Sequence, residues 1–135
     1  MQPVIADTNF LSDILAGKST AKKALTDIIS DGNYIITTVI TTSELFFGAK
    51  RRDWQETRVL KLEEFIDSLQ VLDFTVEHTK VFGALRAELV DTGQDIGFAD
   101  TAITAIALSL DLPIITANIK HFERIENLKI VPYIG

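Results

Sequence analysis

The chain has 135 residues, of which 47% are hydrophobic and 24% charged, and this is enough apolar material for one compact domain with one core. Because there is no cysteine and there are only two histidines, the sequence excludes disulfides and cysteine-rich zinc sites, so any metal must bind mainly through oxygen. The net charge of −6 argues against broad electrostatic binding of nucleic acid, which depends on clustered lysine and arginine.

The composition also allows expectations about the cellular location of the protein and about the positive charge available to bind RNA. The longest apolar stretches, around Ile35 and Ile114, are too short to span a bilayer, and the first residues lack an export signal. We therefore expect a soluble, cytoplasmic protein in which residues 1–135 form a single domain. An RNA ligand would need local positive charge. The basic run Lys50–Arg52 offers some, although short charge runs commonly lie on a solvated face.

The first third of the chain reads as strand, helix, helix, strand. A short apolar strand, Val4–Ala6, ends at Asp7, and Phe10–Leu15 then has helical spacing. Ala21–Ile29 repeats that spacing until an Asp-Gly-Asn break, which precedes the β-branched strand Tyr34–Thr38.

The rest of the chain continues the alternation. Helical spacing marks Thr41–Ala49, Val59–Leu69, Val76–Val90 and the alanine-rich Phe98–Leu110, which we expect to be largely buried; short apolar runs predict strands at Val71–Leu72, Ile114–Thr116 and Leu128–Val131. Alternating strands and helices without internal repeats favour an α/β fold with a central parallel sheet of about five strands, flanked by helices in three layers.

Four oxygen-bearing side chains are expected at one edge of this sheet. Ligands of open parallel sheets collect outside the carboxyl ends of the strands, where Asp7 and Asn118 follow their strands. Glu44 and Asp100 are expected in the first turns of helices. The sequence therefore predicts that these side chains approach the same edge.

Each of these residues also has a plainer interpretation. Asp7 is a common type of N-cap, and Thr41–Glu44 has the spacing of a capping box. Asp95 is a candidate cap for the helix that contains Asp100, and Asn118 is a candidate turn residue. The two histidines, His78 and His121, are interpreted as surface or packing residues, and the aromatic residues at helical spacings as core or partner contacts: Phe46, Phe47, Trp54, Phe65, Phe82 and Phe98.

Four segments, taken together, resemble one family. They are V-I-A-D-T-N-F-L from Val4, T-S-E-L-F-F-G-A from Thr42, D-I-G-F-A-D-T-A-I-T-A-I-A from Asp95, and I-I-T-A-N-I-K-H-F from Ile114. In this order, over nearly the whole chain, they resemble the PIN-domain family, in particular the VapC-type toxin ribonucleases. The combination is specific even though each fragment is not.

The resemblance implies roles for the acidic residues. By position, Asp7, Glu44 and Asp100 match the family's catalytic acids and are expected to bind Mg²⁺ or Mn²⁺, and Asp95 is a further candidate ligand from the preceding loop. Asn118 stands where the family often has a fourth acid. Because an amide adds no negative charge, Asn118 is expected to position water or an outer ligand within the catalytic site.

Two hydroxyl residues and a function follow from the same resemblance. Thr8 and Thr116 match positions that support the acids. The expected activity is hydrolysis of RNA by an endoribonuclease, in which a metal-activated water attacks the phosphorus and leaves 3′-hydroxyl and 5′-phosphate ends. The resemblance further implies the toxin role in a type II toxin–antitoxin pair, a homodimer, and a small VapB-like antitoxin that blocks the acidic site.

Two other functions remain open at this point. A PIN-like module that binds RNA or a partner without cutting is compatible with Asn118 in place of an acid. A phosphoacceptor receiver module fits the length, the alternating pattern, Asp7, Asp73 and Lys120, but it needs an acidic pair at the first strand, where Asp7 is followed by Thr8. Common nucleotide-binding motifs, G-x-x-x-x-G-K-[ST] and G-x-G-x-x-G, are absent.

Overall fold

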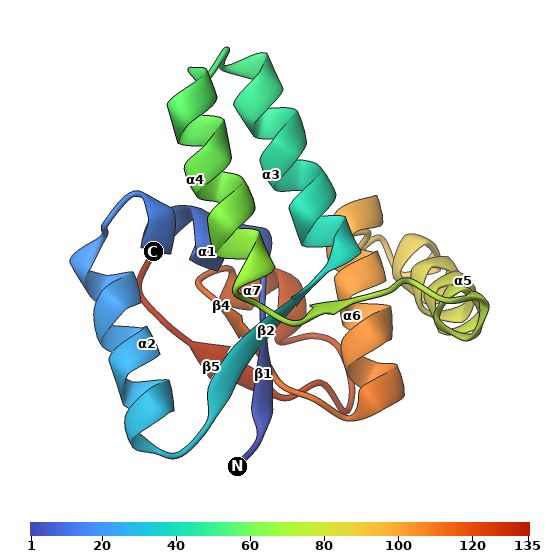
Figure 1. The fold of residues 1–135 in the computed structure, drawn as a ribbon. Coiled ribbons are helices and arrows are strands. Elements are labelled where there is room, and N and C mark those ends of the chain that lie inside the picture. Colours follow the sequence, from blue (N-terminus) through green and yellow to red (C-terminus); the bar gives the residue numbers. More distant parts are fainter.

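The computed structural model describes residues 1–135 and contains one five-stranded parallel sheet. The strands are β1 (Pro3–Ala6), β2 (Tyr34–Thr38), β3 (Val71–Leu72), β4 (Ile114–Thr116) and β5 (Ile130–Pro132). Their order is β3-β2-β1-β4-β5, so the chain builds outward from β1 on one side and then on the other (Figure 1). The strand order therefore changes direction between β1 and β4, which is where ligands of such sheets bind.

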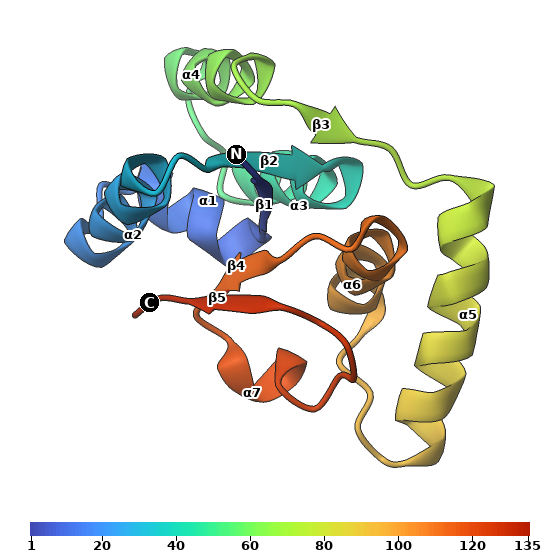
Figure 2. The same ribbon diagram turned by 90° about the horizontal axis from the view of Figure 1, so that it is seen from below.

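Seven helices cover the sheet: α1 (Thr8–Leu15), α2 (Ser19–Ser30), α3 (Val39–Arg51), α4 (Glu56–Asp67), α5 (Val76–Asp91), α6 (Phe98–Leu110) and α7 (Ile119–Phe122). Helices α1 and α2 lie on one side of the sheet, and α5 and α6 on the other (Figure 2). Helices α3 and α4 form a hairpin that projects beyond the carboxyl ends of the strands (Figure 1). The expected three-layer α/β architecture is confirmed.

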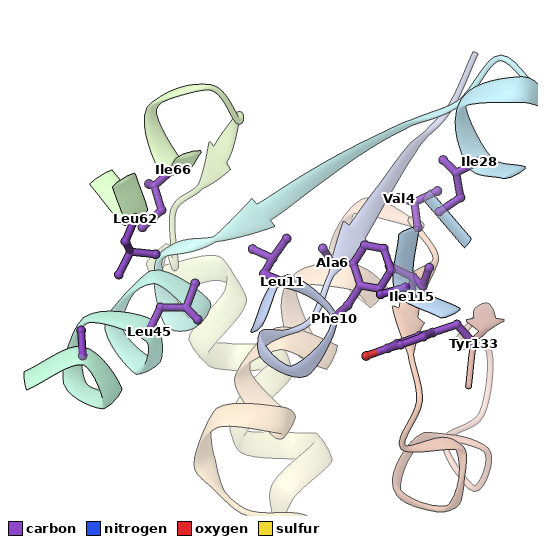
Figure 3. Packing of buried hydrophobic residues seen from close by; sticks show 12 residues of the cluster. Val4, Ala6, Phe10, Leu11, Ile28, Leu45, Leu62, Ile66, Ile115 and Tyr133 are labelled. Carbon is purple, nitrogen blue, oxygen red and sulfur yellow. The ribbon is translucent and has the colours of Figure 1, made fainter. Parts of the chain in front are cut away.

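Alternation along the central strands explains why helices cover both faces. Val4 and Ala6 of β1 belong to the core under α1 and α2, whereas Ile5 belongs to the core under α5 and α6. Figure 3 shows the first of these cores, in which the Phe10 ring packs edge-on against Tyr133 with 5.0 Å between ring centroids. A strand buried on both faces is expected to be mainly apolar, as β1 is throughout and β4 is up to the buried Thr116 at its end.

Helix α6 is the most deeply buried helix, as its alanine content predicted. Every residue from Thr101 to Ala107 is buried. Small side chains allow α6 to lie close to the sheet while α5 packs on its outer side (Figure 2). This packing fixes the start of α6, and with it the position of Asp100.

The structure shifts the bounds of several predicted elements. Helix α3 begins at Val39 rather than Thr41, α4 is Glu56–Asp67 rather than Val59–Leu69, and the last strand is Ile130–Pro132 rather than Leu128–Val131. The one-turn helix α7 was not predicted. No helix has both the length and the apolar character required to cross a membrane. The strand order also differs from the 2-1-3-4-5 order of receiver modules, which removes that alternative.

Candidate active site

The candidate site lies where β1 and β4 end side by side. Asp7 directly follows β1, and Asn118 lies two residues beyond the end of β4. The two strands pair in parallel, with Ala6 opposite Ile115, so their carboxyl ends open at the same edge of the sheet. The predicted placement of Asp7 and Asn118 at this edge is confirmed.

Asp7 is the buried acid of the site. Its side chain is 3% exposed, and one carboxylate oxygen accepts a hydrogen bond from the Phe10 backbone N–H at 2.8 Å, which caps α1. Burial raises the pKa of Asp7 to about 6, against the lowering effect of hydrogen bonds from the Thr116 side chain and the Phe10 amide. The negative charges of Asp100 and Asp13 raise it further. The capping interpretation is therefore correct, but it does not account for a carboxylate held near other acids.

Glu44 reaches the site from α3. The Thr8 hydroxyl donates a hydrogen bond to the Glu44 carboxylate and also lies 3.3 Å from the Thr41 hydroxyl. The capping-box interpretation of Thr41–Glu44 is wrong, because α3 begins at Val39 and its cap is Thr38. Glu44 is consequently in the second turn of the helix, not the first, and its carboxylate points to α1 instead of to its own helix start.

Asp100 lies in the first turn of α6, as predicted, and has a partner that the sequence did not suggest. One of its carboxylate oxygens is 3.1 Å from Nδ1 of His121 in α7. His121 is therefore neither a packing residue nor an isolated surface residue. The contact depends on how the unpredicted helix α7 docks after β4, so no local sequence pattern could indicate it.

Asn118 stands at the start of α7. Its backbone N–H donates to the Thr116 hydroxyl at 2.9 Å, so the backbone turns here as the plainer interpretation required. Its side chain makes no capping hydrogen bond and is half-buried. The amide therefore remains available to a ligand or a water at this edge.

Asp95 is not brought to the other acids by any observed contact. Its carboxylate accepts the Gly97 N–H at 3.0 Å and lies 3.4 Å from the Arg86 guanidinium. The hydrogen bond from Gly97, with Arg86 nearby, lowers the pKa of Asp95. The cap of α6 is Gly97 rather than Asp95, although Asp95 binds the N–H of that cap residue.

Asp13 is an acid that sequence reasoning missed. Its charge acts on Asp7, and its carboxylate accepts a hydrogen bond from the Tyr133 hydroxyl at 2.7 Å and pairs with Lys18 at 3.4 Å. Burial and this hydrogen bond raise the pKa of Tyr133. No local pattern singles out Asp13, because the hydroxyl that it binds, that of Tyr133, lies 120 residues away in the chain.

These side chains form an oxygen-rich site suited to a hard divalent cation. No three Asp, Glu or His side chains are arranged to enclose a metal ion by themselves. Mg²⁺, however, is usually bound by one or two carboxylates and keeps several waters. The raised pKa of Asp7, caused by burial and by neighbouring negative charge, is the condition that a bound cation would relieve. Asp7 and Asp100 therefore fit such an ion, with Glu44 at the rim.

Sequence comparison identifies relatives along nearly the whole chain. The PIN domain profile matches residues 4–128. Ribonuclease VapC2 of Haemophilus influenzae is 30% identical over 129 residues, which are 96% of each chain. The tRNA(fMet)-specific endonuclease VapC of Salmonella typhimurium is 36% identical over 91 residues, 67% of this chain and 69% of that one.

Comparison with solved structures agrees with the sequence comparison. A chain of VapBC2 from Rickettsia felis, crystallised with a DNA fragment from its promoter, superposes with a TM-score of 0.86 at 28% identity over 97% of this chain and 98% of that one. DNA-bound VapBC from Salmonella typhimurium gives 0.83 at 29% identity, with 98% of both chains covered. With its fold, its site and its sequence in agreement, the chain belongs to the PIN-domain family, and VapC ribonucleases are among its relatives.

Proposed function

We propose that the protein is a metal-dependent endoribonuclease and the toxin of a type II toxin–antitoxin pair. The observation that carries this proposal is Asp7, a buried carboxylate with a pKa near 6 whose charge is opposed by Asp100. The fold does not require a charge here, because an uncharged Asn or Ser cap would also accept the Phe10 amide without the cost of burying a charge. Relatives named as ribonucleases support nuclease chemistry at this position.

We propose that Asp7 and Asp100 bind Mg²⁺ or Mn²⁺ directly and that Glu44, at the rim of the site, binds the ion through water, since no three acids enclose an ion by themselves. When bound, such a cation supplies Lewis-acid stabilisation of the phosphate charge and lowers the pKa of water. The Thr8 hydroxyl orients Glu44, and Thr116 hydrogen-bonds Asp7. The Asn118 amide positions water or phosphate at the same edge. We leave Asp95 outside the set because it pairs with Arg86 and Gly97.

Substrate and partners follow from the relatives. The Salmonella relative, a tRNA(fMet)-specific endonuclease, supports tRNA as a substrate class. The VapBC complexes support a small VapB-like antitoxin as the protein partner. A homodimer is also proposed, and the exposed apolar side chains of Val76, Val90 and Phe98 offer surface for protein contacts.

The test is cleavage of labelled RNAs, including tRNAs and structured rRNA fragments, with Mg²⁺, with Mn²⁺ and with EDTA. Asp7→Asn and Asp100→Asn should each abolish cleavage. Asp31→Asn, an exposed acid after α2 at the opposite edge of the sheet, is the matched control and should cut normally. Products should carry 5′-phosphate ends.

Three results would count against the proposal. Cleavage that persists in EDTA would exclude a metal requirement. Fragments with 2′,3′-cyclic phosphate ends would exclude attack by water on the phosphorus. Folded wild-type protein that binds RNA but cuts nothing in the panel would favour a binding module, the alternative that Asn118 in place of an acid leaves open.

A further inference from the structure

A groove leads away from Glu44 towards the far end of the α3–α4 hairpin. It encloses about 380 Å³ between α1, α3 and α4. Asn9, Asp13 and Glu44 line the end near the acids, whereas Arg52, Trp54 and Arg58 line the other end. The groove is therefore continuous with the candidate active site and reverses its charge along its length.

The far end of this groove is the basic part of an acidic protein. Five of the chain's 13 lysines and arginines lie between residues 50 and 61: Lys50, Arg51, Arg52, Arg58 and Lys61. All five are exposed and none makes an ion pair, whereas five of the other eight basic side chains are paired with acids: Lys18, Lys23, Lys80, Arg86 and Lys129. Unpaired cations beside a groove in a chain of net charge −6 favour a polyanionic occupant.

Planar side chains line the same groove. The Arg58 guanidinium carbon lies 3.7 Å above the centroid of the Trp54 ring. Trp54 is half-buried, and its backbone N–H donates to the Ala49 carbonyl at 3.0 Å, which fixes the turn between α3 and α4. Phe47, 67% exposed, adds an aromatic face. Guanidinium planes and aromatic rings are the surfaces on which unpaired RNA bases stack.

We propose that this groove binds a single-stranded segment of the RNA substrate that flanks the cleaved bond. Arg52 and Arg58 contact phosphates, while Phe47 and the Arg58–Trp54 pair stack bases. This inference rests on the proposed function, since Glu44, one of the proposed catalytic acids, lines the end of the groove. The α3–α4 hairpin would thus supply the local positive charge that RNA binding requires in a chain whose net charge is −6.

Binding is measured in the Asp100→Asn background, where RNA is not cut, by anisotropy of a short labelled single-stranded RNA over a series of salt concentrations. Arg52→Gln and Arg58→Gln should each weaken binding on the order of tenfold at low salt and reduce the slope of log K against log salt by about 0.7 per lost phosphate contact. Lys22→Gln, an exposed and unpaired cation on α2, is the charge-matched control and should change neither quantity.

A second pair of variants separates stacking from charge. Arg58→Lys keeps the cation but loses the plane, so it should retain the salt slope while binding weakens. Phe47→Ser should likewise lose roughly tenfold in affinity without changing the slope. Because Phe47 is exposed, its removal should leave the thermal unfolding midpoint close to that of the parent protein.

The outcomes distinguish this inference from the proposed function. Suppose that the wild type cuts RNA, that Arg52→Gln and Arg58→Gln bind like the Asp100→Asn parent, and that the same two substitutions made in the wild type leave cutting unchanged. The groove assignment is then wrong and the nuclease stands. If the wild type cuts nothing while both variants still lose RNA binding, the nuclease fails and the groove remains. Variants that lose binding of a VapB-like partner but keep RNA binding would assign the groove to that partner and overturn the inference.

Discussion

Asp7 has two effects on the free energy of folding that oppose each other: it caps α1, and it buries a negative charge. As the cap of α1 it needs only an oxygen acceptor for the Phe10 amide, and this costs no charge. As a carboxylate that is 3% exposed and faces the charges of Asp100 and Asp13, it destabilises the folded protein whenever it is ionised. Asp7 therefore lowers the stability of the metal-free protein, and a bound cation would offset this loss.

Asp7→Asn should therefore stabilise the metal-free protein, in a manner that depends on pH. Asn keeps the capping oxygen and carries no charge. The pKa of Asp7 is about 6 when folded and 3.8 when unfolded, so protonation favours the folded state and the wild type loses stability as pH rises from about 4 to 6. Above pH 6 the variant should exceed the wild type by about 3 kcal/mol, and below pH 4 the two should converge.

The measurement is urea denaturation in EDTA at several pH values, with Asp31→Asn as the control for loss of a surface charge. Titrating groups that do not interact with Asp7 cancel in the difference between variant and wild type, which leaves Asp7 and its charged neighbours Asp100 and Asp13. A difference that stays constant from pH 4 to pH 7 would show that Asp7 is not ionised at the expense of stability.

His121 is predicted to hold Asp100 in position. A carboxylate only accepts hydrogen bonds, so Nδ1 of His121 donates to Asp100 at 3.1 Å. The amide nitrogen of His121→Asn occupies nearly the place of Nδ1, whereas that of His121→Gln reaches the place of Nε2. Asn should thus keep kcat within about twofold, and Gln should lower it roughly 10- to 100-fold, as loss of an orienting group does at metal sites.

Steady-state cleavage with both variants decides this point. A structural role alone would show in unfolding experiments and would not separate Asn from Gln. If both variants cut equally well, or both fail equally, His121 does not act through the Nδ1 contact.

At the scale of elements, local patterns were sufficient where one pattern runs unbroken along an element. The strands β1, β2 and β4 and the buried helix α6 were predicted because apolar or β-branched runs and helical spacing encode them directly. The placement of Asp7 and Asn118 followed, since both are defined by the ends of such strands. Glu44 was misplaced within its helix because Thr38 and Thr41 both suit a cap, and tertiary contact with Thr8 decides between them.

Contacts between elements far apart in the chain could not be predicted from local sequence patterns. The four-residue helix α7 is too short to show a helical period, so its His121 could not be paired with Asp100. The Tyr133 hydroxyl bonds Asp13 across 120 residues of chain, which no local pattern indicates. Family resemblance supplied the acids as a set, but their partners come only from the structure.

The start of α6 gives a prediction at this scale. Gly97 caps the helix with φ 88° and ψ 170°, a backbone conformation that is nearly confined to glycine. A Cβ would meet no atom within 4 Å, so Gly97→Ala tests backbone strain alone and should cost about 1–3 kcal/mol. It should also lower kcat, because Asp100 lies three residues later.

Gly83→Ala is the matched control. Gly83 lies within α5, and a Cβ there also meets nothing within 4 Å. Removing a glycine from a helix interior should stabilise the protein by about 0.5–1 kcal/mol without changing cleavage. Urea denaturation of the two variants should thus show shifts of opposite sign, and shifts of the same sign would contradict the strain assigned to Gly97.

For the whole molecule, the proposed ion links the site to global stability. The carboxylates proposed to hold the ion come from the end of β1, from α3 and from α6, so an ion held among them cross-links elements that are far apart in the chain. A ligand that binds only the folded state stabilises it by about 2.7 kcal/mol when its concentration is 100 times the dissociation constant. For a chain of this size, that corresponds to a rise of roughly 10 °C in Tm.

Thermal unfolding with Mn²⁺ or Mg²⁺, each compared with EDTA for the same variant, should therefore show a large shift for the wild type and for Asp31→Asn. Asp7→Asn and Asp100→Asn should lose the shift, even though Asp7→Asn starts from a higher Tm. Asp95→Asn should keep it, because Arg86 and Gly97 already engage that carboxylate. Loss of the shift in Asp95→Asn would place Asp95 among the ligands, and a shift that survives in both Asp7→Asn and Asp100→Asn would move the metal elsewhere.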